Sequence, residues 1–417
     1  MNFTELSLNP LIVNAIESAG YSEATPIQAA AIPVIMSGRD LLAGARTGTG
    51  KTAAFALPLL NRILSEDEHL NDTDNLKKVL KILVLAPTRE LAQQVNDSFK
   101  KYAKGSGFRS AVAYGGVGIA PQVNQINKGI DLLVATPGRL LDLIKKRVVK
   151  LSTIEVLVID EADRMLDMGF KDEIKAVMSK LPKSRPEATL RQTLLFSATL
   201  SDNIYKFSKN LLHKPELIEV DQRNSRSLDV QQVVYNCDPE RKLALVGHLI
   251  AKQGWQQVLI FSRTKQGADK IAEALSLTGL SAEAIHADRS QTSREQALSD
   301  FKKGLVNVLV ATDVAARGLD IQQLEAVINF EMPYKPEDYI HRIGRTGRAG
   351  HQGKAITLLI EEENYLLEEV EVLLDERLPQ QWLEGFEPDF TRVIEVNRKN
   401  SKSAQKRRAK NRALGKR

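Results

Sequence analysis

One glycine-rich segment in the first half of the chain has the residues of a phosphate-binding loop. The segment reads ARTGTGKT and consists of Ala45, Arg46, Thr47, Gly48, Thr49, Gly50, Lys51 and Thr52. Backbone N–H groups of such a loop can surround phosphate oxygens, while the lysine ammonium reaches the β- and γ-phosphates and the Thr52 hydroxyl can ligate Mg²⁺. The first position holds alanine, where this pattern usually has glycine. The segment predicts a site for a nucleoside triphosphate, with an ordinary glycine-rich turn as the alternative.

Acidic side chains cluster further along the chain, in the sequence Asp160-Glu161-Ala162-Asp163, directly after an apolar run. One carboxylate in this position can hold the Mg²⁺ of a bound nucleotide, and its neighbour can orient or deprotonate the attacking water. We assign Asp160 to the metal and Glu161 to the water. The alternative is an acidic helix N-terminus, which the helix macrodipole favours.

The second half of the chain contains three arginines among glycines, in the segment HRIGRTGR at 341–348. Such a segment makes a poor core and a poor strand, but it lets guanidinium groups approach an anion closely. We therefore expect this segment to contact phosphate, with a solvated basic loop as the alternative.

Strands must position these residues, and the chain contains short apolar runs that are suited to this. They lie at 40–45, 81–86, 131–136, 155–160, 193–198, 257–262, 306–312, 325–330 and 355–360. Each is followed by a turn and a helix-compatible stretch, which is typical of strands buried on both faces of a parallel sheet. The predicted fold class is α/β, with two tandem parallel-sheet domains. Because ligands bind at the carboxyl ends of the strands in such sheets, the motifs should share one edge of each sheet.

A polar segment containing Pro215 interrupts this alternation and indicates a domain boundary. We expect a first domain at 1–210, a linker at 211–228, a second domain at 229–362, an acidic helical extension at 363–390 and a basic tail at 391–417. Residues 361–377 carry eight acids and one arginine, with Leu and Val at helical spacing. This acidic stretch either docks on the second domain, self-associates or binds a partner.

The positive charge of the chain is concentrated in its tail. The whole chain has a net charge of +6, and residues 391–417 contribute +10 from eleven Lys or Arg and one Glu, so the remainder sums to −4. A segment rich in Lys, Arg, Ser and Asn is expected to be disordered and to bind polyanions. Counterion release would make such binding non-specific and salt-dependent. Inert solubilisation is the alternative role for the tail.

The composition excludes several classes of protein. With 417 residues, of which 43% are hydrophobic and 26% charged, the chain has the length of two or three domains and the composition of a soluble globular protein. Cys237 is the single cysteine, which excludes an intrachain disulfide and a cysteine-based zinc site. The sequence begins without a signal-peptide pattern and lacks an apolar run of about 18 residues, so we expect a cytoplasmic protein without a membrane partner.

Taken in order, the motifs are similar to those of the DEAD-box ATP-dependent RNA helicases. The resemblance covers residues 3–360 and rests on Phe3 followed by GYSEATPIQ, ARTGTGKT, PTREL, GG, TPGR, DEAD, SAT, LIFSRT, ATDVAARGLD and YIHRIGRTGR. The bacterial RhlE-like group is the most similar subgroup. The main departure is Ala24, where the family often has proline; this loosens a turn but leaves Gln28 in place.

The resemblance implies two RecA-like domains and an RNA-stimulated ATPase that separates short RNA duplexes or remodels ribonucleoproteins. ATP with Mg²⁺ and single-stranded RNA would close the two domains and bend one RNA strand into a path that a duplex cannot follow. Ribosomal proteins and RNA-decay proteins are the partners that the resemblance suggests. A DNA translocase on the same architecture, an ATP-dependent RNA clamp, and a nucleotide kinase or GTPase are the alternatives.

Residue by residue, the resemblance also implies roles at the nucleotide. Gln28 would read the adenine edge with one amide donor and one acceptor, Phe3 would pack near the base, and Asp320 would contact the ribose. The implied catalytic residues are Lys51, Thr52, Asp160, Glu161, Arg345 and Arg348. The last two would act as arginine fingers toward the γ-phosphate. The residues implied to couple the ATP state to RNA are Asp163, Ser197, Thr199 and His341.

RNA contacts are implied at strand ends in both domains. In the first domain they are Pro87, Thr88, Arg89, Gly116, Thr136, Gly138 and Arg139. In the second domain they are Arg263, Gln291, Arg294, Thr312 and Gly318. Small residues, hydroxyls and arginines at these positions suit contacts to phosphates and 2′-hydroxyls, so the predicted binding follows the RNA backbone and is independent of sequence.

Overall fold

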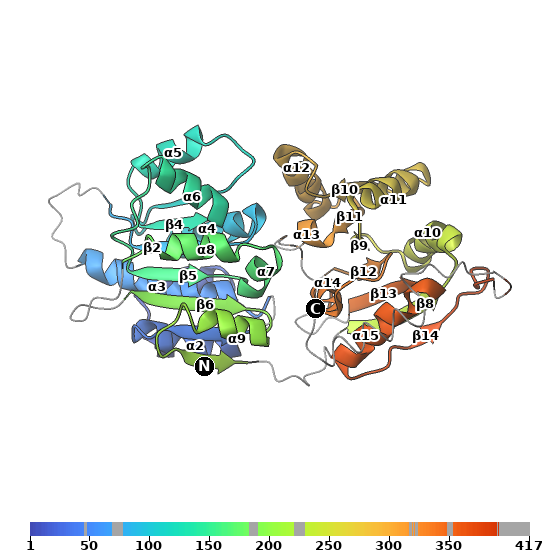
Figure 1. Cartoon of the computed structure of the whole chain (residues 1–417), viewed down its shortest axis with the longest axis horizontal. Helices are drawn as coiled ribbons and strands as arrows, with labels where there is room; N and C mark the ends of the chain where they lie inside the picture. The colour runs from blue at the N-terminus through green and yellow to red at the C-terminus, as the bar shows by residue number, and fades with distance from the viewer. Residues whose placement is uncertain are drawn as a thin grey trace. The chain divides into compact units, whose positions relative to one another are not determined.

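The chain divides into two compact units, Met1–Ser225 and Arg226–Arg417. The computed structural model describes residues 1–45, 48–68, 78–182, 191–220, 230–316, 319, 321, 324–347, 353–389 and 391. Each unit is built on one parallel sheet, shown in blue to green for the first unit and in yellow-green to red for the second (Figure 1).

The first unit contains a sheet in the order β3-β4-β2-β5-β6-β1-β7, and its neighbouring strands pair in parallel. Its strands are β1 (Leu41–Gly44), β2 (Ile82–Leu85), β3 (Ser110–Ala113), β4 (Leu132–Ala135), β5 (Val156–Ile159), β6 (Gln192–Ser197) and β7 (Glu216–Glu219). The five strands that the sequence predicts in this half are confirmed.

Helices cover both faces of this sheet. They are η1 (Phe3–Leu6), α1 (Pro10–Ser18), α2 (Pro26–Met36), α3 (Lys51–Glu68), α4 (Arg89–Tyr102), α5 (Ala120–Asn127), α6 (Pro137–Lys145), α7 (Ala162–Asp167), α8 (Lys171–Met178) and α9 (Asp202–Ser208). Alternate residues of one strand enter different cores, because Ile82 and Val84 join the cluster formed with α1–α4, whereas Leu83 and Leu85 join the cluster formed with α5–α9. Burial on both faces explains why the strands are continuous apolar runs.

The edge strand β7 corrects the predicted linker. It lies inside the segment 211–228 and pairs with β1 through Leu41–Glu216 to Gly44–Glu219, so the first sheet extends past residue 210. An edge strand has one hydrogen-bonded neighbour and can leave side chains in solvent; Leu217 is 50% exposed. The segment therefore lacks the apolar run by which the central strands are predicted.

The second unit repeats the architecture in the order β10-β11-β9-β12-β13-β8-β14, again with parallel pairs. Its strands are β8 (Val230–Asn236), β9 (Val258–Ser262), β10 (Ala282–Ile285), β11 (Val308–Thr312), β12 (Ala326–Asn329), β13 (Gly353–Leu359) and β14 (Gln380–Gln381). Its helices are η2 (Pro239–Arg241), α10 (Lys242–Gln253), α11 (Lys265–Leu277), α12 (Gln291–Lys302), α13 (Asp313–Ala316), α14 (Pro336–Ile343), η3 (Glu361–Glu363) and α15 (Asn364–Leu374). The predicted α/β fold with two parallel-sheet domains is confirmed.

The acidic extension docks on the second unit. Leu366, Leu367 and Val370 of α15 are buried in one cluster with Tyr339 and Ile343 of α14. Beyond α15, strand β14 adds to the sheet by pairing with β8. Of the three alternatives for residues 361–377, packing on the second unit is the one that the structure shows. Residues 392–417 of the predicted tail lie outside the described residues.

None of the helices in the described ranges combines the length and the apolar character that crossing a membrane requires.

Candidate nucleotide site and nucleic-acid interface

The glycine-rich loop connects the carboxyl end of β1 to the start of α3. Gly48 and Gly50 have φ angles of 82° and 91°, a left-handed conformation that glycine adopts without steric cost. The Lys51 ammonium is buried and donates a hydrogen bond to the Ala45 carbonyl oxygen at 2.7 Å. Thr52 follows in the first turn of α3. Arg46 and Thr47, also predicted in this loop, lie outside the described residues.

Gln28 connects the start of α2 to this loop. Its Oε1 atom accepts a hydrogen bond from the Thr25 backbone N–H at 2.9 Å, and its Nε2 atom donates to the Gly50 carbonyl oxygen at 3.2 Å. A Cβ atom at Gly50 would overlap the Gln28 amide, so glycine is required here for close approach as well as for its φ. Phe3 is buried in the core of the first unit, in the cluster that contains residues of α2 and α3. Adenine recognition by Gln28 and Phe3 stays a prediction.

The carboxylates of the DEAD segment follow β5. Asp160 is 2% exposed, and its Oδ1 atom accepts a hydrogen bond from the Glu161 N–H at 2.9 Å. Burial raises the pKa of Asp160 to about 7, and the nearby Lys51 ammonium opposes that rise. A buried carboxylate of this kind gains from a cation, so its chemistry fits a divalent metal ion arriving with a nucleotide.

Glu161 has an unusual backbone and a fixed side chain. Its φ and ψ of 51° and 55° are left-handed, which is uncommon for a residue with a side chain. Its Oε2 atom pairs with Nη1 of the buried Arg164 at 2.8 Å. Arg164 is a site residue that the sequence reasoning missed, although its position one helical turn after Glu161 is a signal that could have indicated the pair.

Asp163 links the DEAD segment to the SAT segment after β6. Its Oδ2 atom accepts hydrogen bonds from the Ala198 N–H at 3.1 Å, the Thr199 N–H at 3.0 Å and the Thr199 hydroxyl at 3.2 Å. The Ser197 hydroxyl instead donates to the Thr199 carbonyl oxygen at 2.7 Å. Asp163 is therefore bonded directly to Thr199, whereas the Ser197 hydroxyl bonds to the backbone of the turn.

The predicted RNA contacts of the first unit follow three neighbouring strands. Gly116 follows β3; Thr136, Gly138 and Arg139 follow β4; and Pro87, Thr88 and Arg89 follow β2. Thr88 caps α4 by accepting the Leu91 N–H at 3.3 Å. Neighbouring parallel strands end at one edge of the sheet, so these residues share the edge that carries Lys51 and Asp160.

Two arginines at this edge are held against the loop that follows β3. The Arg139 guanidinium donates to the Val117 carbonyl oxygen and to the Gln122 side chain, both at 2.9 Å. Arg89 lies against Gly116, whose φ is 81°, and a Cβ atom on Gly116 would overlap the Arg89 guanidinium. Gly116 therefore makes room for an arginine, a role that residue type alone does not reveal.

In the second unit, the predicted RNA contacts again follow neighbouring strands. Thr312 ends β11, Arg263 follows β9, and Gln291 and Arg294 occupy the first turn of α12, which follows β10. Gly318 lies outside the described residues, as does Asp320, the predicted ribose contact.

The segment HRIGRTGR corrects one prediction. Arg342 is 1% exposed, and its guanidinium pairs with the Asp313 carboxylate at 2.6 Å and donates to the Glu331 carbonyl oxygen at 2.6 Å. This arginine is part of the core, contrary to the expectation that the segment is unsuited to one, because the Asp313 carboxylate compensates its charge. Arg345 is 7% exposed and donates to the Leu319 carbonyl oxygen at 2.7 Å.

His341 and Arg348 are the remaining predicted residues of this segment. His341 lies in α14, which belongs to the second unit. Arg348 lies outside the described residues.

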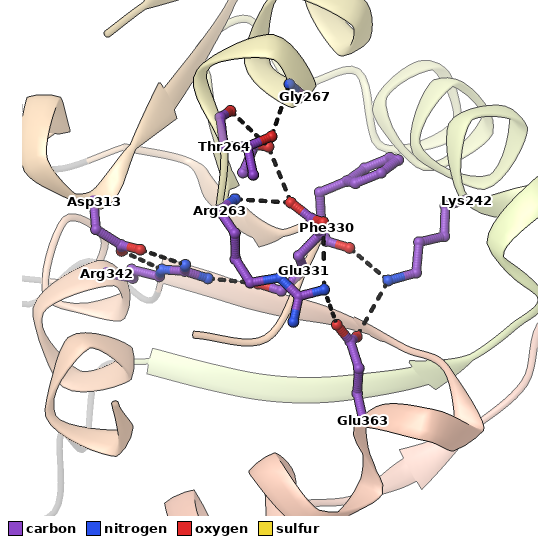
Figure 2. A network of polar contacts seen from close by, with 10 residues as sticks. Lys242, Arg263, Thr264, Gly267, Asp313, Phe330, Glu331, Arg342 and Glu363 are labelled. Atoms are coloured by element: carbon purple, nitrogen blue, oxygen red, sulfur yellow. Dashed lines mark hydrogen bonds and ion pairs between the residues drawn. The ribbon is translucent and has the colours of Figure 1, made fainter. Parts of the chain in front are cut away.

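A network of polar contacts surrounds Arg263 and was not predicted. Figure 2 shows its guanidinium between the carboxylates of Glu331 and Glu363. The Glu363 carboxylate also contacts the Lys242 ammonium. Glu363 comes from the acidic extension, far from Arg263 in sequence, so residue spacing gives no signal for this pair.

Comparison with known proteins places this site in a family. Residues 25–207 match the DEAD/DEAH box helicase family, and residues 241–350 match the helicase conserved C-terminal domain. The chain is 41% identical to the ATP-dependent RNA helicase CshA of Listeria monocytogenes over an alignment of 388 residues. This alignment covers 92% of this chain and 72% of that protein. It is 40% identical over 371 residues to the DEAD-box ATP-dependent RNA helicase CshA of Bacillus subtilis, which covers 89% of this chain and 72% of that protein.

Solved structures agree with these matches. The structure of Saccharomyces cerevisiae Dbp5 bound to RNA and ADP BeF3 has a TM-score of 0.79 at 28% identity, covering 91% of this chain and 95% of that chain. The two parallel-sheet units are therefore RecA-like helicase domains. The chain belongs to the DEAD-box family of ATP-dependent RNA helicases.

Proposed function

We propose that the chain is an RNA-stimulated ATPase that separates short RNA duplexes or remodels ribonucleoproteins by ATP-driven closure of its two units. The observation that carries this proposal is that one edge of the first sheet holds both sets of residues. Lys51, Asp160 and Glu161 follow β1 and β5, while Arg89 and Arg139 follow β2 and β4. Binding of nucleotide and binding of RNA can therefore influence neighbouring turns.

For hydrolysis, we assign Lys51 to the β- and γ-phosphates and Glu161 to the attacking water. The ion pair with Arg164 holds the Glu161 carboxylate in a defined position, which supports this role. Mg²⁺ bound with ATP would neutralise phosphate charge, and Thr52 and Asp160 are the residues suited to hold it.

Gln28 supports adenine recognition in this proposal, because its amide already contacts the loop at Gly50 and a base there would meet a positioned side chain. Arg345 and Arg348 would contribute positive charge at the γ-phosphate when the units close, an effect that can be worth about 10³–10⁵ in rate. Asp320 would contact the ribose.

RNA binding would use backbone contacts from both units, because the predicted residues are hydroxyls, glycines and arginines rather than base-reading side chains. The basic segment 391–417 would tether RNA in a salt-dependent manner. The RhlE-like subgroup stays a prediction of the sequence, since the bacterial relatives described above are CshA proteins. A cytoplasmic location and ribosomal or RNA-decay protein partners also stay predictions.

A strand-displacement assay with Glu161→Gln tests this function. The glutamine amide keeps the size of the side chain and an oxygen that can accept from Arg164, but it cannot accept a proton from water. We expect the variant to bind ATP and RNA with wild-type affinity, to hydrolyse ATP about 10²–10⁴-fold more slowly, and to release little strand on multiple turnovers.

Three other outcomes would contradict the proposal. Near wild-type RNA-stimulated hydrolysis in Glu161→Gln would overturn the assignment of this residue. Wild-type protein that hydrolyses ATP and holds RNA without displacing a strand would be a clamp. Equal displacement of DNA and RNA strands would favour the DNA translocase.

A further inference from the structure

Tyr334 is an exposed aromatic residue that a neighbouring side chain holds in place. It lies in the loop between β12 and α14 and is 68% exposed. The Arg263 guanidinium carbon lies 4.8 Å from the centroid of the Tyr334 ring, within the range of a cation–π contact. An arginine plane against a ring restricts the rotamers that an exposed tyrosine would otherwise sample.

Arg263 is itself anchored by two carboxylates. Its Nη2 atom lies 2.6 Å from Glu363 Oε1 and 3.4 Å from Glu331 Oε1. Its backbone N–H donates to Glu331 Oε2 at 2.7 Å, and the Ser262 hydroxyl donates to the same oxygen at 3.0 Å. Figure 2 shows these contacts converging on Glu331 and Glu363 from the end of β9 and from α10. The side chain that backs Tyr334 is therefore fixed at its backbone and at its guanidinium.

The charges around Arg263 are balanced. Glu363 also pairs with the buried Lys242 at 3.5 Å, so two cations face the carboxylates of Glu331 and Glu363. Burial alone would lower the pKa of Arg263, but the two carboxylates outweigh it and raise that pKa above its ordinary value. Arg263 stays charged, and its charge is already compensated from within the unit. Its planar guanidinium also supports the Tyr334 ring.

The position of this pair in the sheet places it beside the predicted RNA contacts. Strand β9 lies between β11 and β12, with Ser262 opposite Thr312 and Phe261 opposite Asn329. Arg263 therefore lies at the sheet edge next to Thr312, and the loop that carries Tyr334 leaves the adjacent strand at the same edge.

We propose that Tyr334, backed by Arg263, is a stacking site for an unpaired nucleobase of bound RNA. The proposal rests on the proposed RNA-binding function and adds a contact that recognises a base face rather than the backbone. Every base has a π-face, so such a contact is tolerant of sequence, and base–aromatic stacking is worth about 1–3 kcal/mol per base. A base inside a duplex has neighbours on both faces, so Tyr334 stacks only on a base that has left the helix.

Equilibrium binding of a fluorescent single-stranded RNA to the full chain, in the presence of a non-hydrolysable ATP analogue, tests this site. The variants are Tyr334→Ala, which removes the ring, and Tyr334→Phe, the matched control that keeps it. We expect Tyr334→Phe to bind within about twofold of wild type and Tyr334→Ala to bind about 5–150-fold more weakly, which corresponds to the loss of one stacked base. Because Tyr334 is mostly exposed, thermal unfolding of both variants should match wild type.

A second set of RNAs, each lacking the base at one position, separates stacking from backbone binding. We expect one such RNA to bind wild type as weakly as Tyr334→Ala binds the intact RNA, and to bind both proteins equally. Wild-type affinity of Tyr334→Ala for intact RNA would overturn the stacking site while leaving the proposed function intact. The same would follow if Tyr334→Ala bound every base-deleted RNA more weakly than wild type, by the same factor. A wild-type chain that binds no RNA would overturn both.

Discussion

The carboxylate of Asp163 accepts hydrogen bonds from both the backbone N–H and the hydroxyl of Thr199, at 3.0 and 3.2 Å. Asp163 lies in the first turn of α7, directly after the β5 turn, and Thr199 lies in the turn after β6; β5 and β6 are neighbours in the sheet. The same β5 turn carries Asp160 and Glu161, the residues assigned to hydrolysis. We therefore expect a rearrangement at the nucleotide to reach the turn after β6 that contains Thr199.

Replacing Thr199 with valine removes one of these bonds and keeps the backbone N–H bond. We expect the free energy of unfolding of the first unit to fall by about 0.5–1.5 kcal/mol, the net value of one hydrogen bond. We also expect less strand displaced per ATP hydrolysed, because the connection between the two turns is weaker. The measurement is the ratio of the two rates in one reaction mixture.

The matched control for this variant is Thr153→Val. The Thr153 hydroxyl also makes one hydrogen bond, to the Leu80 carbonyl oxygen at 2.7 Å, but it precedes β5 at the opposite edge of the sheet. Thr153→Val should lower the free energy of unfolding without changing the amount of strand displaced per ATP hydrolysed. A ratio in Thr199→Val equal to that of wild type would contradict a coupling role for this bond.

Gly116 and Gly115 form a second matched pair of variants. At Gly116 the φ of 81° and the adjacent Arg89 guanidinium both oppose a side chain, so Gly116→Ala should displace Arg89 and weaken RNA binding by about tenfold, or ~1.4 kcal/mol. At Gly115 a Cβ atom would meet nothing within 4 Å, and Gly115→Ala should bind RNA like wild type. ATP affinity should be unchanged in both. Equal RNA affinity of the two variants would argue against Arg89 as an RNA contact.

The central strands and the site residues that follow them can be predicted from the sequence. Central parallel strands are buried on both faces, so their apolar runs are visible, and the chemistry-bearing residues follow those runs because ligands bind at the carboxyl edge. Edge strands lack this signal, so the sequence predicts a linker where β7 lies. Leu217 and Glu219 of β7 are exposed and Ile218 packs against the core, so the strand is not a continuous apolar run.

Ion pairs between residues that are far apart in the sequence cannot be predicted from residue spacing either. The three arginines of HRIGRTGR look alike in the sequence, yet Arg342 is buried because Asp313 compensates its charge. Glu363 belongs to the acidic stretch whose partner the sequence leaves open, and it contacts Arg263 and Lys242, which are far from it in sequence. Only the packing of the second unit shows which partners these residues have.

Cys237 provides a pH-dependent probe of the second unit. It is 3% exposed, and burial raises the pKa of its thiol to about 11, although Lys242 opposes the shift. Because the thiolate is the reactive form, alkylation at pH 8 should be about 100-fold slower in the folded protein than in the unfolded chain, from the difference in pKa alone. As the single cysteine, it makes whole-chain labelling report on this one position.

The same shift predicts how stability varies with pH. An acid whose pKa is raised by folding contributes stability that is complete below the unfolded pKa of 9.0 and is lost as the pH rises toward about 11. Chemical denaturation of wild type and Cys237→Ala across this range measures the effect, since the variant lacks it. Alkylation of the native chain as fast as that of the unfolded chain at pH 8 would contradict the burial of this thiol.

Steady-state ATP hydrolysis without nucleic acid, with RNA and with DNA, each at two salt concentrations, tests the proposed function most directly. We predict slow hydrolysis without nucleic acid, strong stimulation by RNA alone, and a higher RNA concentration for half-maximal stimulation at the higher salt. Equal stimulation by DNA, or hydrolysis that RNA does not change, would contradict an RNA-dependent ATPase.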